Sequence, residues 1–391
     1  MRSPTQFLAA LVTALSLTAC GGSSVGAGEQ TPKATFTTMV SFGDSLSDVG
    51  SYRVGTLTAV GGGKYTVNST SAKNWTEIVS AVYGLPEPCS AQTGLDGSAA
   101  AGLSVPVTDH PACLNYAQGG ARIIQPIGPG NKLLGGSNAT LGQLTVPLVK
   151  QMANHLARVG GAFSGNELVT VFAGGNDLFM QMAAVGAAAD GGANAVQLGV
   201  VAGWTTGADA LATTLLGGGP AAATTAAAQA VSAMGSAGAA LAALVNTQLA
   251  AKGARKILVL NLGKASKTPY GLAQTPDAQG LIDLLTTTFN DQLRLGLTGT
   301  QGVVLVDCYT ESTAQATNPG PYGLSDVSTP VCDKSPARNF LGGTALACTD
   351  ANVIAGDVSH YLYADDVHPT PFGYQLLAKL VLFEMVKAGW L

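Results

Sequence analysis

The chain has 391 residues, of which 47% are hydrophobic and only 11% are charged, and its formal net charge at pH 7 is −4. This length suffices for one large domain or two modest ones with a sizeable core. The apolar composition argues against a disordered chain, and the lack of a basic surplus argues against a nucleic-acid-binding protein. We therefore expect a folded protein that has no nucleic acid as a partner.

The N-terminus has the features of an export signal. Arg2 precedes a short apolar segment, residues 7–17, and "LTAC" then places Cys20 after small residues. This pattern predicts a lipoprotein signal peptide over residues 1–19, with a lipid on Cys20 that anchors the chain in the bacterial cell envelope, at the outer membrane. The alternative is an ordinary signal peptide of a secreted protein, with an unrelated cysteine. Residues 20–36 are rich in Gly and Ser, and we expect a flexible tether there.

Five more cysteines follow the signal segment. Disulfides are permitted in an exported protein, because it meets oxidising conditions. Two local pairs in loop-like surroundings are plausible, Cys89 with Cys113 and Cys332 with Cys348. Cys308 ends an apolar run, and we expect it to be a buried thiol. Since the count is odd, this pairing is a preference only. The sequence has no CxxC pair or histidine-rich cluster that would indicate a metal site.

Short apolar runs alternate with helical patterns along the chain. Helical patterns precede the third, fourth and fifth runs, and a further one closes the chain from Pro371. This alternation predicts a single α/β domain over residues 37–391, with right-handed crossovers and helices on both faces of a buried parallel sheet. The five predicted strands are "TTMVSF", "CLNYA", "ELVTVFAG", "KILVLNL" and "GVVLVD".

One long segment contains no charged residue at all, from Ala210 to Ala251. Such a stretch is typical of a membrane span, but this one consists mostly of Ala, Gly, Thr and Ser and is interrupted by "GGGP". We therefore favour a weakly amphipathic helix that packs on the sheet. The Ala- and Gly-rich residues 180–219 are a candidate insertion that borders the functional site.

"FGDSLSD" ends the first predicted strand in a way that points to chemistry at Ser45. Gly, Asp and Ser are common in turns, but open parallel sheets bind ligands at the carboxyl ends of their strands. A helix beginning at Leu46 or Ser47 would place the Ser45 amide at the positive end of a helix dipole. Ser47 stands where the nucleophile elbow G-x-S-x-G has its second glycine, which counts against an α/β-hydrolase.

A reactive serine needs a base, and that base usually needs a third group to orient it. His155 belongs to a helical pattern and His110 to a loop, whereas His360 in "GDVSHYLY" is a real competitor. His368 in "DDVHPT" follows Asp365 by three residues, a spacing that brings side chains together, on a stiff loop just before the closing helix. We therefore favour His368 as the base and Asp365 as the group that orients it.

A reactive serine also needs hydrogen-bond donors for the oxyanion of the tetrahedral intermediate. "NYAQGGAR" follows the second predicted strand, and its Gly119 and Gly120 allow backbone amides to approach a ligand closely. "FAGGNDLF" follows the third, and Asn176 offers an amide NH2 group. Taken singly, Gly-Gly and Asn-Asp are turn signals. Because both segments follow strands at the sheet edge where Ser45 lies, we interpret them together as oxyanion donors.

These four segments, in this order, resemble the sequence blocks of the SGNH/GDSL hydrolases. The resemblance implies Ser45 as nucleophile, His368 as base and Asp365 as its partner, with Asp366 as a less favoured partner. It also implies an oxyanion hole formed by the amides of Ser45 and Gly120 and by the side chain of Asn176, with Gly119 less certain.

The resemblance covers roughly residues 37–391. It implies a three-layer α/β/α fold with a mostly parallel, five-stranded, flavodoxin-like sheet, and no metal or organic cofactor. "NPGPYGLSDVSTPVC" and "YLYADDVHPT" look most like secreted bacterial lipolytic esterases. We therefore expect a serine esterase that cleaves acyl esters or lipids, phospholipids included, through an acyl-enzyme. The alternatives are a carbohydrate O-deacetylase of the same family and a non-catalytic surface-binding lipoprotein. The sequence does not indicate the oligomeric state.

Overall fold

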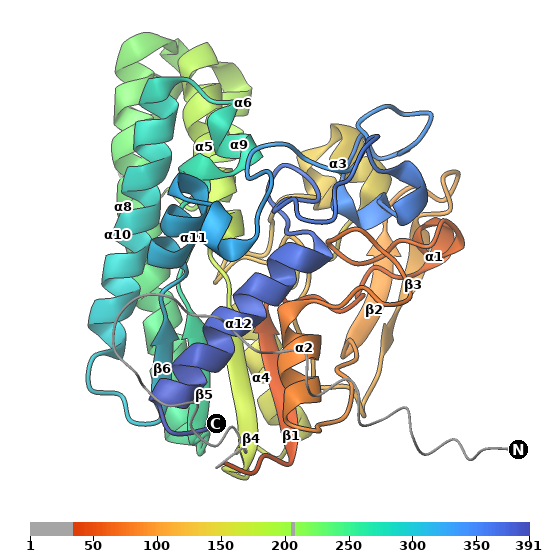
Figure 1. Ribbon diagram of the computed structural model, residues 1–391. Coiled ribbons are helices and arrows are strands. Elements are labelled where there is room, and N and C mark those ends of the chain that lie inside the picture. Colours follow the sequence, from red (N-terminus) through yellow and green to blue (C-terminus); the bar gives the residue numbers. More distant parts are fainter. Residues whose placement is uncertain (1–33, 205–207) are drawn as a thin grey trace, which may run out of the picture.

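The computed structural model describes residues 34–204 and 208–391. Cys20, the predicted signal peptide and most of the predicted tether lie outside the described residues. A parallel sheet of four strands occupies the centre, in the order β1-β4-β5-β6 (Figure 1). Gly43, Phe172, Leu260 and Val306 are aligned across the sheet, so all four strands end at one level. The strands are β1 Thr38–Gly43, β4 Glu167–Phe172, β5 Lys256–Leu260 and β6 Val303–Val306.

The second predicted strand, "CLNYA", is not a regular strand in the structure. It runs alongside β1, where it forms a single parallel bridge between Asn115 and Ser41. The Asn115 side chain donates to Ser47 O and accepts from Ala117 N–H, and Cys113 is held by a disulfide, so the segment turns away before a ladder can form. The predicted five-stranded sheet therefore has four regular strands. The segment still occupies the fifth position, beside β1, as the flavodoxin-like order requires.

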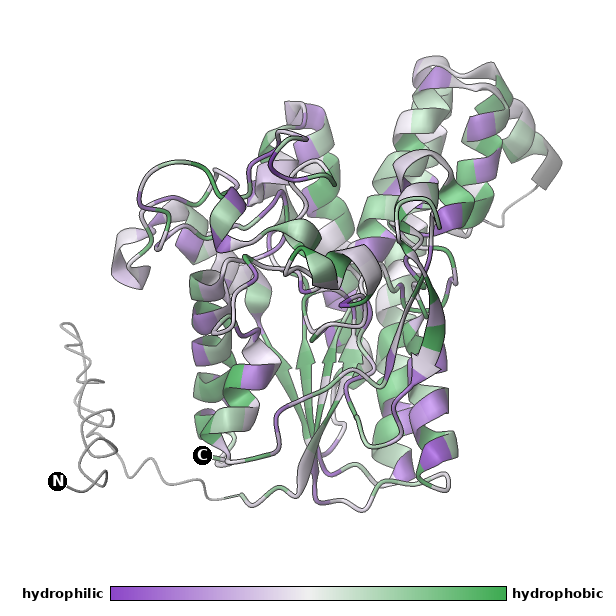
Figure 2. Ribbon diagram, turned by 90° about the vertical axis from the view of Figure 1, so that its right-hand side faces the viewer, coloured by the Kyte–Doolittle hydropathy of each residue, from purple (hydrophilic) through white to green (hydrophobic). Residues whose placement is uncertain are grey.

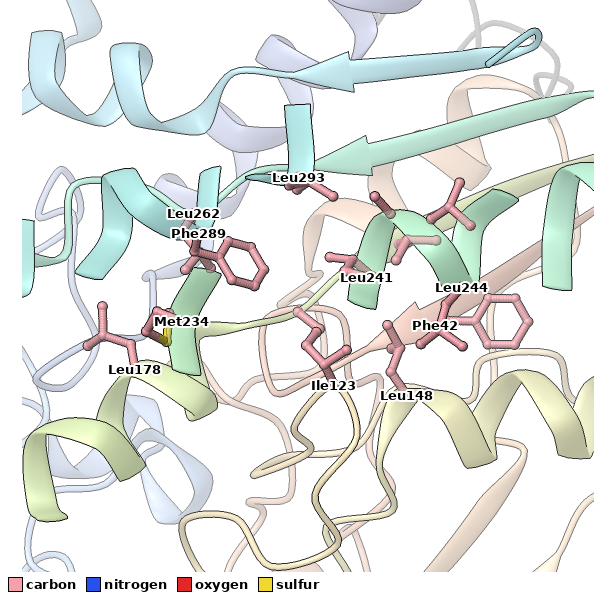
Figure 3. Packing of buried hydrophobic residues seen from close by; sticks show 14 of the residues in the cluster. Phe42, Ile123, Leu148, Leu178, Met234, Leu241, Leu244, Leu262, Phe289 and Leu293 are labelled. Carbon is pink, nitrogen blue, oxygen red and sulfur yellow. The ribbon is translucent and has the colours of Figure 1, made fainter. Parts of the chain in front are cut away.

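Helices cover both faces of the sheet, which confirms the predicted α/β architecture (Figures 1 and 2). Residues of the strands alternate between two cores: Val40 and Val169 belong to one, and Met39 and Leu168 to the other. Figure 3 shows the first core, in which Phe42 lies among side chains from several helices. That face is covered by α4 Leu148–Arg158, α5 Gly175–Asp190, α8 Gly219–Leu244 and α10 Pro276–Leu297, and the other by α2 Trp75–Val82 and α12 Pro371–Lys387.

The remaining elements are short and lie mostly beyond the ends of the strands. A two-stranded antiparallel sheet pairs β2 Gln92–Asp96 with β3 Ser104–Asp109. The candidate insertion, residues 180–219, comprises most of α5 together with α6 and α7 (Figure 1). The shorter helices are α1 Gly55–Ala59, α3 Gly136–Leu141, α6 Gly192–Ala202, α7 Ala208–Gly217, α9 Pro269–Leu272 and α11 Cys308–Thr317.

The uncharged segment forms the long helix α8, which continues into a π-helical turn at Val245–Leu249. By length and composition alone, residues Gly219–Lys252 would suffice to cross a membrane. However, α8 packs along α5 and α10, as Figure 1 shows, and buries Ala226, Ala230 and Met234 there. Gly238 lies so close to α10 that a Cβ atom would be 2.3 Å from Phe289 O. The small residues of α8 therefore allow neighbouring helices to approach closely. This supports the prediction of a helix packed within the domain.

Two disulfides are present, Cys89–Cys113 and Cys332–Cys348. Cys308 is a free thiol and is buried. This is the pairing that the sequence favours. The second disulfide holds the loop that contacts the functional site, because Ala345 lies between its two cysteines.

Candidate active site

Ser45 lies two residues beyond β1, in a turn rather than at the start of a helix. The helix considered for Leu46 or Ser47 is absent; Asp44 accepts from Leu46 N–H at 3.0 Å, and the chain continues as a turn. Asp48 in the same way accepts from the amides of the two residues at 50 and 51. Ser45 therefore does not lie at the start of a helix of its own. The serine is instead fixed by the side-chain hydrogen bonds of two buried aspartates.

Three side chains form a hydrogen-bonded chain at the carboxyl edge of the sheet. Ser45 Oγ lies 2.8 Å from His368 Nε2, and His368 Nδ1 lies 2.8 Å from Asp365 Oδ2. The closing helix α12 begins at Pro371, as the sequence predicts, and Thr370 caps it, so His368 sits on the short segment that leads into it. The structure thus brings together the serine, histidine and aspartate that the sequence singles out.

The Asp365 carboxylate is held by backbone amides as well as by the imidazole. His368 N–H donates to Oδ1 at 2.8 Å, Val367 N–H donates to the same oxygen at 3.0 Å, and Ala345 N–H donates to Oδ2 at 2.8 Å. Burial by itself would raise the pKa of Asp365, but the charge of His368 and these hydrogen bonds hold the pKa below its ordinary value. Asp365 is therefore an anion that fixes the orientation of the imidazole.

The other candidate residues lie in different surroundings. His360, the competing base, packs edge-on against Phe372. Asp366, the alternative partner, forms a surface ion pair with Lys334 at 2.7 Å. His155 is buried among aromatic rings, and burial lowers its pKa to about 4, so it stays neutral. His110 contacts the Thr93 hydroxyl. All four histidines lie in the described part of the chain. Only His368 bonds to Ser45, the serine next to the candidate oxyanion donors.

Two backbone amides near Ser45 have no hydrogen-bond acceptor within residues 34–204 and 208–391: those of Ser45 and Gly120. The Gly119 amide, in contrast, donates to Asp48 Oδ2 at 3.0 Å. This geometry favours Gly120 over Gly119 as a donor to a ligand. Gly120 has φ 77°, and a Cβ atom there would lie 2.2 Å from Pro129 O, so this position requires glycine.

Asn176 occupies the first turn of α5 and is only 6% exposed. Its Nδ2 donates to Ala121 O at 2.8 Å, which ties the asparagine to the loop of Gly120. An amide NH2 group has two hydrogens, so one remains for a ligand. The side-chain donor and the backbone donor are thereby held at a fixed separation.

A buried ion pair that the sequence analysis missed reinforces the same junction. Arg122 Nε donates to Asp177 Oδ1 at 2.9 Å, and Ile123 N–H donates to Asp177 Oδ2 at 3.0 Å. The guanidinium also donates to two carbonyl groups at the end of α6, those of Val201 and Ala202. Arg122 follows the Gly-Gly pair and Asp177 follows Asn176. Arg122 and Asp177 could have been found from the sequence, because each lies close to a predicted oxyanion donor, Gly120 or Asn176.

Two further side chains adjoin the reacting groups. The ring of Tyr65 lies 4.7 Å from the ring of His368, and its hydroxyl is buried with no hydrogen-bond partner in the described part of the chain. Asp44 is 3% exposed; burial raises its pKa to about 7, although the hydrogen bond from Leu46 and the charge of His368 oppose this. A carboxyl group next to the serine therefore titrates close to neutral pH.

A mostly apolar cavity of about 180 Å³ opens at Ser45, Asn176 and His368. From there it runs between α11 and α12, where Leu377 and Leu380 contribute to its wall. Its shape and lining suit an apolar chain attached to a group that reacts at Ser45. In the residues described here, no three His, Cys, Asp or Glu side chains come together in a way that would hold a metal ion.

The fold and this constellation define a class of enzyme: a three-layer α/β hydrolase with a serine at the carboxyl edge of its sheet. The sequence matches the family model of the GDSL-like lipases and acylhydrolases over residues 39–381, and the chain belongs to this family. The resemblance inferred from the four sequence blocks is thereby confirmed. No curated protein matches the chain significantly. Family membership makes the protein a hydrolase that acts on esters.

Proposed function

We propose that the protein is a serine esterase that cleaves carboxylic esters through a covalent acyl-enzyme. The observation that carries the proposal is the hydrogen-bonded chain from Ser45 through His368 to Asp365. His368 accepts the Ser45 proton as Oγ attacks the ester carbonyl, and Asp365 stabilises the resulting imidazolium. The imidazole then gives this proton to the leaving alcohol. A water molecule activated by the same imidazole releases the acid and regenerates the serine.

The oxyanion of each tetrahedral intermediate is held by three donors in this proposal. They are the free amides of Ser45 and Gly120 and the second N–H of Asn176. Each such donor typically lowers the barrier by about 3–4 kcal/mol. Because the donors are fixed by the Asn176–Ala121 contact and by the Arg122–Asp177 pair, little reorganisation is needed during the reaction.

The cavity beside Ser45 supports an uncharged acyl chain as the group that is transferred. Polar side chains that line it are bonded to the protein: Lys264 to Asp283, and the Ser312 hydroxyl to Lys264 N–H and Tyr309 O. A sugar would instead need free polar groups for its hydroxyls. Acyl esters, lipids included, are therefore better candidates than the acetylated carbohydrates of the alternative hypothesis.

The purified protein should hydrolyse p-nitrophenyl acetate, octanoate and palmitate at rates that define its acyl preference. We expect Ser45→Ala to lower kcat by about 10⁴-fold or more, because both attack and acyl transfer need the hydroxyl. Ser71→Ala, at an exposed serine of a surface loop, is the matched control and should retain full activity. A fully active Ser45→Ala protein with an unchanged melting temperature would refute the proposal.

We further propose that the protein is exported and held at the bacterial outer membrane by a lipid on Cys20. The pattern of residues 1–20 and the two disulfides, which form in oxidising compartments, support this location. Metabolic labelling with palmitate should be lost in Cys20→Ser and retained in the control Cys308→Ser, whose thiol is buried. Label retained by Cys20→Ser would contradict the anchor.

A further inference from the structure

A second cavity, of about 720 Å³, lies between α5 and the start of α10. We call it the α5–α10 groove. Its apolar side chains are half-buried, and those from α5, α9 and α10 pack against the main core. They are contributed by three elements and by the loop before His368, and comprise Phe179, Met182, Val185, Tyr270, Leu281 and Val367.

The α5–α10 groove begins at the wall of the reacting site. Phe179 and Val367 line both this groove and the cavity that opens at Ser45. Phe179 lies one helical turn beyond Asn176 and packs edge-on against Tyr270, with 5.0 Å between ring centroids. Tyr270 N–H donates to Asp366 O at 2.9 Å, so α9 is joined to the segment that carries His368. The two cavities are thus neighbours that share a wall beside the reacting atoms.

We propose that the α5–α10 groove binds the alcohol part of the ester, and that preferred substrates carry an apolar, uncharged alcohol chain. This inference rests on the proposed esterase function. When the acyl-enzyme forms, the C–O bond to the alcohol breaks and the proton taken from Ser45 passes from His368 Nε2 to the alcohol oxygen. That oxygen must lie at the imidazole, and the two residues directly before His368, Asp366 and Val367, line the groove. The cavity between α11 and α12 then holds the acyl chain.

The charge of the groove excludes anionic alcohols. Asp277 and Asp366 are part of its lining, and no basic side chain is. Lys334 pairs with Asp366 from the surface, whereas Asp277 lies exposed in the first turn of α10 without an ion-pair partner in the described ranges. A phosphate or carboxylate on the alcohol would be repelled by this negative charge. The groove therefore favours neutral alkyl alcohols over the anionic headgroup of a phospholipid.

A comparison of two esters of similar size distinguishes the roles of the two cavities. Octyl acetate has its apolar chain on the alcohol, and ethyl octanoate has it on the acyl group. Ala183 is exposed on α5 and lines the groove, so Ala183→Trp should fill the groove without entering the core. We expect this change to lower the ratio of kcat/KM for octyl acetate to that for ethyl octanoate by about tenfold, the usual effect of losing a few apolar contacts. Ala189→Trp, at an exposed position of α5 outside the groove, should leave the ratio at the wild-type value.

The outcomes separate the groove assignment from the esterase proposal. An unchanged ratio in Ala183→Trp would refute the assignment, and an increased ratio would show that the groove holds the acyl chain instead. Hydrolysis of both esters has to depend on Ser45; hydrolysis that survives Ser45→Ala would refute the proposed function itself. 8-Acetoxyoctanoate, which carries a carboxylate at the end of the alcohol chain, should react at least about tenfold more slowly than octyl acetate. Equal rates would refute the preference for uncharged alcohols.

Discussion

Replacing Asn176 by alanine tests the oxyanion arrangement most directly. The side chain has two N–H groups, of which one bonds to Ala121 O at 2.8 Å and the other is assigned to the oxyanion. Loss of an oxyanion donor typically costs about 2.7–4 kcal/mol of transition-state stabilisation, so kcat should fall by about 100- to 1000-fold. Loss of the bond to Ala121 should lower the free energy of unfolding by only about 1 kcal/mol. KM should change little, because the donor acts mainly in the transition state.

Steady-state kinetics with p-nitrophenyl octanoate, together with urea unfolding, would measure both effects in one preparation. Asn246→Ala is the control: its amide donates to Gly296 O at 2.9 Å and accepts from the Thr300 hydroxyl at 2.8 Å, far from the reacting groups, so stability should fall by at least as much while kcat stays unchanged. A decrease in kcat of less than tenfold in Asn176→Ala would refute the assignment of this side chain as an oxyanion donor. A decrease that Asn246→Ala reproduces would show that general destabilisation is the cause.

Three further predictions concern the base, a buried carboxyl group and a disulfide. His368→Ala should lower kcat by at least about 10³-fold and His360→Ala by less than about twofold, since His368 alone bonds to the serine; a larger loss at His360 would reverse the assignment. The pKa of Asp44 is raised to about 7, so the folded state keeps a proton that the unfolded state releases near pH 4. The free energy of unfolding of the wild type should therefore fall between pH 4 and pH 7, relative to that of Asp44→Asn. Urea unfolding at several pH values would measure this, and parallel pH profiles would contradict it. The double change Cys332→Ser, Cys348→Ser should lower the free energy of unfolding by about 3 kcal/mol, the value for a loop of this length; thermal and urea unfolding with unchanged midpoints would contradict it.

Much of the fold was predictable because its signals are local. Val40, Val169 and Val259 belong to short apolar runs that only a sheet buried on both faces would tolerate, and each forms a strand. "CLNYA" was also predicted as a strand but does not form a regular one, and it contains no β-branched residue. The Asn115 side chain donates to Ser47 O, 68 residues away in the sequence, and no local pattern reveals this hydrogen bond.

The candidate site also has features that could be predicted from local sequence signals and features that could not. Asp365 and His368 are three residues apart, so their pairing could be predicted from spacing, and Ser45 from its place after a strand. Arg122 and Asp177 are 55 residues apart in the sequence, and their ion pair depends on how a loop meets the start of α5. The turn at Ser45 also differed from the helix considered there, because the side chain of Asp48 accepts from the amides of residues 50 and 51, which a helix would bond to backbone carbonyl groups. Contacts made across the fold were thus the ones that escaped prediction.

The hydrogen bond between Ser45 and His368 joins residues that are 323 positions apart, almost the full length of the described chain. Closing so long a loop is entropically costly, and it is achieved only when the sheet and the last helix have come together. During synthesis the serine emerges early and its base emerges near the end. In the proposed mechanism, the growing chain therefore carries an unreactive serine, which becomes a nucleophile only once folding is complete. Activity is for this reason a direct reporter of complete folding, and any chain that ends before His368 should be inert.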